Sequence, residues 1–258
     1  MEPHNERWPN GLGRPTWARL MNQTRHRMRY AQPMPLPSPP SLHKLQSALL
    51  AGATGLVGRA LAAQWPGPQP LHLLVRRELK ASGPGQRVYV VDFAGLPPLP
   101  RAEWAFCCLG TTIKVAGSQA AFRAVDFDAV LAFARAASAA GVTHFAVVSA
   151  LGANPGSGNF YSRTKGEMEA ALATAGFRHL VIARPSLLAG DRASLAQAPR
   201  CAEALTLTLV RPLAGLIPKA WRPIEAATVA RALVRGLAEA KPGVTILNSA
   251  ALHDLGAR

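Results

Sequence analysis

The sequence predicts an α/β domain built on a doubly wound parallel sheet. Two observations support this prediction: short apolar runs alternate with helical segments from about residue 45 onward, and a glycine-rich turn follows the first run. Apolar runs of this length are typical of parallel strands that are buried on both faces. A chain of 258 residues is long enough for one such domain with a substantial core.

The expected strands and helices follow each other along the chain. Strands are expected over 47–51, 71–75, 87–91, 104–109, 144–149, 179–184 and 244–248. Helices are expected from the glycine turn to about residue 63 and over 122–140, 161–175 and 226–240. Residues 186–223 show no regular pattern, so we expect a small C-terminal region there, on the side of the sheet where a substrate would lie.

The first 44 residues do not resemble the rest of the chain, and we expect a disordered, basic, Pro-rich tail. Five of the eight residues over 33–40 are proline, and no carboxylate lies between Glu6 and Glu78. An Arg-rich, acid-poor leader is also typical of a transit peptide, and a true start nearer to Met34 is a third interpretation. The domain proper is expected over 45–258.

The overall charge and the cysteines exclude several classes of function. A net charge of +15 permits binding to polyanions, but the arginines are scattered without aromatic neighbours, which does not favour nucleic acid as a partner. The three cysteines, Cys107, Cys108 and Cys201, have no zinc or disulfide spacing. They fit a reducing compartment, which we take to be the cytoplasm. No apolar run approaches ~20 residues, so no membrane span is expected. His144, His179 and His253 are separated in sequence and lie beside apolar runs, so we expect structural histidines rather than metal ligands.

The glycine turn "GATGLVG" indicates a nucleotide site. Gly52, Gly55 and Gly58 leave a predicted strand and open a predicted helix. The first glycine permits a tight turn, the second lets the backbone approach a pyrophosphate, and the third lets the helix pack closely on the strand. The N-terminus of the helix then stabilises the phosphate charge. This context makes the fold a Rossmann-type fold.

The end of the second strand selects the cofactor. An acidic residue about 20 positions after the glycines would bind the 2′-hydroxyl of the adenine ribose of NAD. Arg76 and Arg77 stand there instead, and guanidinium groups match a 2′-phosphate in charge and geometry. NADPH is therefore the predicted cofactor. Asp92 follows the third strand, near the adenine, and residues 109–111 follow the fourth, near the nicotinamide half.

A second motif, "VVSALGANPGSGNFYSRTK", predicts an acid–base site. Tyr161 and Lys165 are spaced i, i+4 and share one helix face, and Ser149 ends the fifth strand. An ammonium group beside a phenol favours the phenolate, so Tyr161 could exchange a proton with a carbonyl oxygen that Ser149 holds. Both motifs belong at the carboxyl edge of one sheet, so we interpret them as one site.

The chain resembles the short-chain dehydrogenase/reductase superfamily, and within it the atypical branch of Tat-interactive-protein-like oxidoreductases. The resemblance covers about 45–258 and is carried by the two motifs above, by "FCCLGTT", by "RPSLLAGDR" and by the terminal "ALHDLG". It implies NADPH binding and catalytic roles for Ser149, Tyr161 and Lys165. Many reductases of the superfamily carry an Asn that positions a relay water in the helix after the fourth strand. Here the nearest position is Asp126.

The sequence thus predicts an NADPH-dependent reductase of a small carbonyl compound or related electrophile, with hydride from the nicotinamide and a proton from Tyr161. The alternative is a non-catalytic NADPH-binding regulatory protein that acts on a protein partner. The residues expected to bind the cofactor are Gly52, Thr54, Gly55, Leu56, Val57, Gly58, Arg76, Arg77, Asp92, Leu109, Gly110, Thr111, Lys165, Arg184 and Pro185.

Overall fold

The computed structural model describes residues 47–65, 69–80, 83–189 and 218–257, and within these it confirms the predicted fold class. The strands of the main sheet are β1 (Ala48–Ala51), β2 (Leu71–Val75), β3 (Gln86–Val90), β4 (Trp104–Cys107), β5 (His144–Val148), β6 (His179–Arg184) and β9 (Gly243–Asn248). The predicted tail over 1–44, Cys201 and most of the predicted substrate-side region lie outside the described residues.

The main sheet is parallel, and its strand order is that of a Rossmann fold. The order is β3-β2-β1-β4-β5-β6-β9, with a short parallel pair, β7 (Leu188–Ala189) and β8 (Ile224–Glu225), beside it. The direction of winding reverses between β1 and β4, whose register pairs Ala51 with Cys107. Ligands of such sheets bind outside the carboxyl ends of the strands at this reversal.

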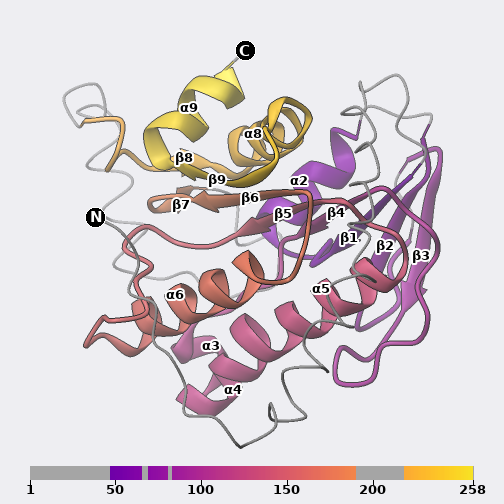
Figure 1. Ribbon diagram of the computed structural model, residues 1–258, viewed down its shortest axis with the longest axis horizontal. Coiled ribbons are helices and arrows are strands. Elements are labelled where there is room, and N and C mark those ends of the chain that lie inside the picture. Colours follow the sequence, from indigo (N-terminus) through magenta and orange to yellow (C-terminus); the bar gives the residue numbers. More distant parts are fainter. Residues whose placement is uncertain (1–46, 66–68, 81–82, 190–217, 258) are drawn as a thin grey trace, which may run out of the picture. The chain divides into compact units, whose positions relative to one another are not determined.

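Helices cover both faces of the sheet (Figure 1). The described helices are α2 (Leu56–Ala63), α3 (Ile113–Ala116), α4 (Gln119–Arg123), η2 (Ala124–Asp128), α5 (Ala129–Ala139), α6 (Phe160–Ala173), α8 (Ala226–Glu239) and α9 (Ser249–Ala257). One apolar core lies under α2, α8 and α9, and a second lies under α5 and α6. None of the helices in the described part of the chain is long and apolar enough to cross a membrane.

The helix predicted over 122–140 differs from the prediction in two ways. It begins earlier, at Gln119, where the Ser118 hydroxyl accepts a hydrogen bond from the amide of Ala121 at 3.0 Å. Its second segment, η2, is a turn of π-helix rather than α-helix. A π-turn adds one residue to a helical turn and is frequently found at functional sites. Neither apolar periodicity nor helix propensity distinguishes such a turn from an α-helix.

The amino-terminal ends of the central strands carry a stack of buried rings. Trp104, His144 and His179 stand in register on β4, β5 and β6. The two imidazoles stack with ring centroids 4.2 Å apart, and the indole stacks on His144 at 5.6 Å. Burial, and next the neighbouring His179, lowers the pKa of His144 to about 4, which keeps this ring neutral near pH 7. These histidines pack in the core, at the sheet edge opposite the glycine turn.

Candidate active site

Two cavities adjoin at the carboxyl edge of the sheet, where the winding reverses. One has a volume of about 270 Å³ and the other about 870 Å³. The residues that line both of them are Gly55, Cys108, Leu109, Gly110, Thr111 and Val115. The ends of β1 and β4 therefore form the boundary between the two cavities.

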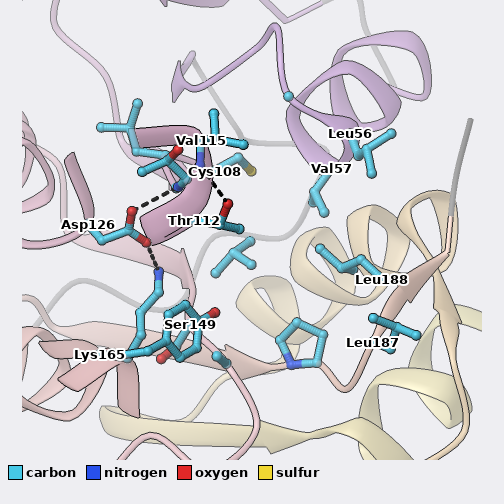
Figure 2. Close-up of a pocket in the computed structure, with 18 of the residues that line it drawn as sticks. Leu56, Val57, Cys108, Thr112, Val115, Asp126, Ser149, Lys165, Leu187 and Leu188 are labelled. Atoms are coloured by element: carbon cyan, nitrogen blue, oxygen red, sulfur yellow. Dashed lines mark hydrogen bonds and ion pairs between the residues drawn. The ribbon is translucent and has the colours of Figure 1, made fainter. Parts of the chain in front are cut away.

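The smaller cavity brings together the three predicted acid–base residues. Ser149, Tyr161 and Lys165 all line it, although they come from the end of β5 and from α6. The predicted cofactor residues that also line it are Gly55, Leu56, Val57, Leu109, Gly110, Thr111 and Pro185. Figure 2 shows an apolar wall of Leu56, Val57, Leu187 and Leu188 facing a polar wall that carries Asp126, Ser149 and Lys165.

The Ser149 hydroxyl lies in this cavity without a partner. Its residue is only 5% exposed, and the Oγ atom has no hydrogen-bond partner among the residues that the structure describes. A buried hydroxyl without a partner costs free energy and is expected to have a functional reason. A ligand oxygen that reached this atom would supply the missing partner.

Tyr161 lies in the first turn of α6, whose start is fixed by Asn159. The side chain of Asn159 accepts a hydrogen bond from the amide of Ser162 at 3.1 Å, as an N-cap does. The Tyr161 ring packs on the fully buried Phe122, with centroids 5.3 Å apart. Phe122 of α4 thus packs on one side of the Tyr161 ring, and α6 places this ring at the cavity.

Lys165, one turn further along α6, is paired with Asp126. Its ammonium nitrogen lies 2.7 Å from Asp126 Oδ1, and both side chains are almost completely buried. Burial by itself lowers the pKa of the Lys165 ammonium, but the Asp126 carboxylate and next Tyr161 outweigh burial and raise it. Lys165 is therefore protonated near neutral pH. The sequence identified Asp126 only as the residue nearest to the superfamily's Asn.

The larger cavity extends towards the ends of β2 and β3. The predicted cofactor residues that line it are Gly52, Thr54, Gly55, Arg76, Asp92, Leu109, Gly110 and Thr111. The Asp92 carboxylate also accepts a hydrogen bond from the amide of Ala94 at 2.9 Å, which fixes the loop after β3. Asp128 and Arg135 line the cavity too, from η2 and α5. No motif in the sequence indicates these two residues, because helical segments far along the chain from the glycine turn contribute them.

The glycine turn has little free space at two of its three glycines. A Cβ atom on Gly52, whose φ is +84°, would lie 2.4 Å from the carbonyl oxygen of Cys108. One on Gly58 would lie 2.1 Å from the carbonyl oxygen of Gly52. Gly55 is less crowded and lines both cavities. It is the N-cap residue of α2, and no side chain among the described residues caps this end of the helix. The amides of that helix end are therefore free to bind an anion.

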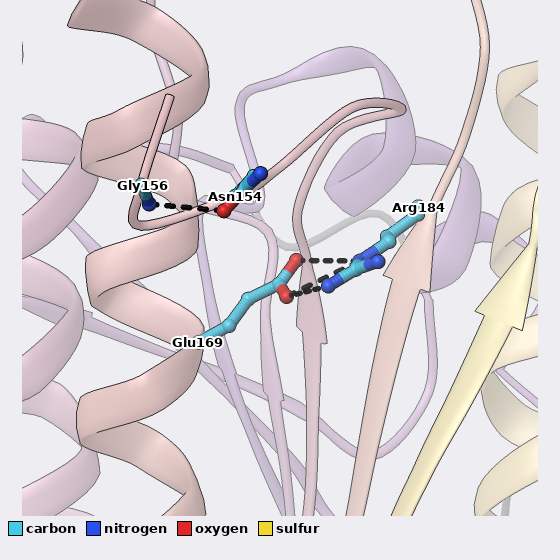
Figure 3. A network of polar contacts seen from close by, with 4 residues as sticks. All are labelled: Asn154, Gly156, Glu169 and Arg184. Atoms are coloured by element: carbon cyan, nitrogen blue, oxygen red, sulfur yellow. Dashed lines mark hydrogen bonds and ion pairs between the residues drawn. The ribbon is translucent and has the colours of Figure 1, made fainter. Parts of the chain in front are cut away.

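Three residues of the predicted cofactor set line neither cavity: Gly58, Arg77 and Arg184. Gly58 packs against the turn, as described above. Arg184 extends from the end of β6 to the buried Glu169 on α6 (Figure 3), and its Nε donates to Glu169 Oε1 at 3.0 Å. A bidentate ion pair between a guanidinium and a carboxylate is a strong interaction. Arg184 thus fastens α6 to β6 rather than facing the cavities.

Two cysteines lie beside the site, and neither thiol is activated. Burial raises the pKa of Cys107 to about 12, and burial raises the pKa of Cys108 as well. A nucleophilic or redox-active cysteine requires the opposite shift. Cys108 lines both cavities as a small apolar side chain.

Comparison with solved structures supports the fold. MoeE5 in complex with UDP-glucose and NAD superimposes with a TM-score of 0.61 over 78% of this chain and 75% of the other, at 18% identity. A UDP-N-acetylglucosamine 4-epimerase from Methanobrevibacter ruminantium M1 gives 0.60 over 79% and 76%, at 14% identity. With the strand order described above, these likenesses place the protein in the class of Rossmann-fold proteins.

Sequence comparison narrows the class to a family. Protein HTATIP2 of Rattus norvegicus is 33% identical over 228 residues, which span 82% of this chain and 89% of the rat protein. Protein FMP52, mitochondrial, of Debaryomyces hansenii is 34% identical over 154 residues, which span 57% and 68%. No family model matches the chain. The chain belongs to the HTATIP2 family, the Tat-interactive-protein-like branch of the atypical short-chain dehydrogenases/reductases.

The same comparison corrects the predicted location. Relatives from Debaryomyces hansenii and Candida glabrata are both named mitochondrial. They point to mitochondria rather than to the cytoplasm, so the prediction was wrong. Cysteine usage reports only on the redox state of a compartment, and it does not identify which reducing compartment holds the protein.

Proposed function

We propose that this protein is an NADPH-dependent reductase of a small carbonyl compound or a related electrophile. The observation that carries the proposal is the unpartnered, buried hydroxyl of Ser149 in the same cavity as Tyr161 and Lys165. A hydroxyl waiting for a partner, a phenol and an ammonium are the groups that polarise a carbonyl oxygen and deliver a proton to it.

The residues present fit a nicotinamide dinucleotide. Gly55 and the uncapped start of α2 would hold the pyrophosphate, since amides at a helix N-terminus bind anions. Arg76 and Asp92 line the larger cavity, which suits the adenosine half, and its volume of about 870 Å³ is in the range of ligand sites. NAD is a ligand of the solved relative MoeE5. When bound, a reduced nicotinamide supplies the hydride.

The chain's own residues supply the proton and the orientation. The Ser149 hydroxyl would donate a hydrogen bond to the substrate oxygen and so fix its position. Tyr161 would donate the proton to that oxygen as the carbonyl is reduced. Lys165 is assigned two tasks, to hold the nicotinamide ribose and to hold a positive charge beside the phenol.

We assign the substrate to the side of residues 186–223, within a domain that begins near residue 45. Ser186, Leu187 and Leu188, the described start of that segment, line the smaller cavity beside Ser149. Leu187 and Leu188 lie opposite Asp126, Ser149 and Lys165 in Figure 2, which favours a substrate with one polar oxygen and an apolar remainder.

Steady-state oxidation of NADPH across a panel of aldehydes, ketones and quinones tests the reductase. At least one compound is expected to consume NADPH and yield the corresponding alcohol or hydroquinone in equal amount. Tight NADPH binding without turnover on any compound would instead support the alternative, a non-catalytic NADPH-binding regulator with a protein partner. One observation favours that alternative: the charge of Lys165 is already compensated by Asp126.

The cofactor preference is expected to depend on Arg76. The unmodified protein should bind NADPH at least about tenfold tighter than NADH, which is ~1.4 kcal/mol. Arg76→Ala should remove most of this preference, because Arg76 lines the larger cavity and its guanidinium would bind a 2′-phosphate. Arg77→Ala is the matched control, since Arg77 lines neither cavity. Titration calorimetry measures the six affinities, those of the three proteins for NADPH and for NADH.

Equal affinities of the unmodified protein for NADPH and NADH would contradict the cofactor assignment. Equal losses in the two arginine variants would keep NADPH but contradict the assignment to Arg76.

A further inference from the structure

Asp126 joins the acid–base lysine to the loop that follows β4. Its Oδ1 lies 2.7 Å from the Lys165 ammonium, and its Oδ2 accepts a hydrogen bond from the amide of Thr111 at 2.8 Å. Figure 2 shows the Asp126 carboxylate with a dashed line from each of its oxygens, one of which ends at the Lys165 ammonium. Asp126 is fully buried and Lys165 is 3% exposed, so both charges are shielded from bulk water.

The local structure is built to admit this carboxylate. Asp126 occupies the middle of η2, the π-turn between α4 and α5, which changes the direction of side chains relative to an α-helix. Gly110 lies directly beside the pair, since a Cβ atom there would make ordinary contacts, 3.4 Å from Asp126 Oδ1 and 3.9 Å from the Lys165 nitrogen. An unusual turn and a residue without a side chain thus meet at one ion pair.

Each of the two buried charges depends on the other. An ionised group that is buried without a partner loses its hydration and shifts towards its neutral form. The titratable groups that face Lys165 are Asp126 from η2, Tyr161 from α6 and the thiol of Cys107 from β4. Of these, the Asp126 carboxylate contributes most to keeping the lysine charged against the effect of burial.

We infer that Asp126 is a positioning residue of this site, which holds Lys165 protonated and fastens it to the β4 loop by direct contact. The inference rests on the proposed function, in which Lys165 assists Tyr161. In many reductases of the superfamily, an Asn at about this position holds a relay water. Here a carboxylate, that of Asp126, contacts the lysine directly.

The protonation state of Lys165 can be measured without turnover. Competitive acetylation with trace acetic anhydride, read by mass spectrometry across a pH series, gives a midpoint and a limiting rate for each lysine. Nα-acetyl-lysine amide, added to the same tube, is the reference. In the unmodified protein, the Lys165 midpoint is expected to lie above that of the reference.

Asp126→Asn keeps the size of the side chain and removes its charge, so burial then dominates. The Lys165 midpoint is expected to fall below that of the reference, and acetylation at pH 8 should increase about tenfold or more relative to the unmodified protein. An unchanged midpoint would overturn the inference. A higher limiting rate without a shift of the midpoint would overturn it too, because it would mean that the substitution only opened the structure.

Two outcomes separate this inference from the proposed function. Absence of reductase turnover would contradict the function and leave the acetylation result standing. Turnover together with a Lys165 midpoint at or below that of the reference, both in the unmodified protein, would support the function and contradict the inference about Asp126. If Asp126→Asn does not fold, the Lys165 midpoint of the unmodified protein still tests the inference, because a midpoint at or below that of the reference would contradict it.

Discussion

Tyr161→Phe is expected to lower the rate of NADPH-dependent reduction by ~10²–10⁴-fold, the usual contribution of general acid catalysis. The substitution removes only the hydroxyl that would donate the proton. The ring that remains still packs on the buried Phe122 at 5.3 Å, so the fold and the cavity should survive. The measurement is kcat on the best substrate of the carbonyl panel, with NADPH affinity determined in parallel.

Tyr89→Phe is the matched control for this variant. Tyr89 lies on β3, and its hydroxyl contacts His72 Nδ1 at 3.1 Å, outside both cavities. Its loss should leave both kcat and NADPH affinity nearly unchanged. If Tyr161→Phe reduces the substrate as fast as the unmodified protein does, the catalytic role of Tyr161 is wrong. In a non-catalytic regulator, neither substitution would change partner binding.

The sheet could be predicted from the sequence because its strands are short, apolar and buried on both faces. The predicted ranges 71–75 and 179–184 coincide with β2 and β6, and the other strands differ by one or two residues at their ends. The strand order follows from the same pattern, since alternating strands and helices of this length give a doubly wound sheet with right-handed connections.

The contacts within the site could not be predicted in the same way. The spacing of Tyr161 and Lys165 gives a shared helix face, but it does not reveal that Asp126, 39 residues before Lys165, meets the ammonium. Asp126 lies in the π-turn, which leaves no mark in an apolar pattern. Arg184 illustrates the opposite case: it stands at the strand end where a cofactor would lie, yet the buried Glu169 binds it.

The predicted location was wrong, as the relatives named mitochondrial show. The prediction followed the low cysteine content, which favours a reducing compartment and does not decide between the reducing compartments of a cell.

Gly58→Ala is expected to destabilise the protein by about 3 kcal/mol or more and to weaken NADPH binding at least about tenfold. The added methyl group would lie 2.1 Å from the carbonyl oxygen of Gly52 and 2.7 Å from its carbonyl carbon. Both atoms are backbone, so no flexible side chain can move aside, and the turn or α2 must shift. A shift of either moves the Gly55 backbone, which would contact the pyrophosphate.

Two further glycines separate the loss of stability from the loss of binding. Gly95→Ala should change neither, because a Cβ atom there meets nothing within 4 Å. Gly256→Ala places a methyl group 2.3 Å from the carbonyl oxygen of Thr228, so it should destabilise the protein as Gly58→Ala does. It lies in α9, outside both cavities, and the folded fraction should bind NADPH normally. Denaturant unfolding and calorimetry below the melting temperature measure the two effects. Normal NADPH affinity in folded Gly58→Ala would mean that the glycine turn does not hold the cofactor.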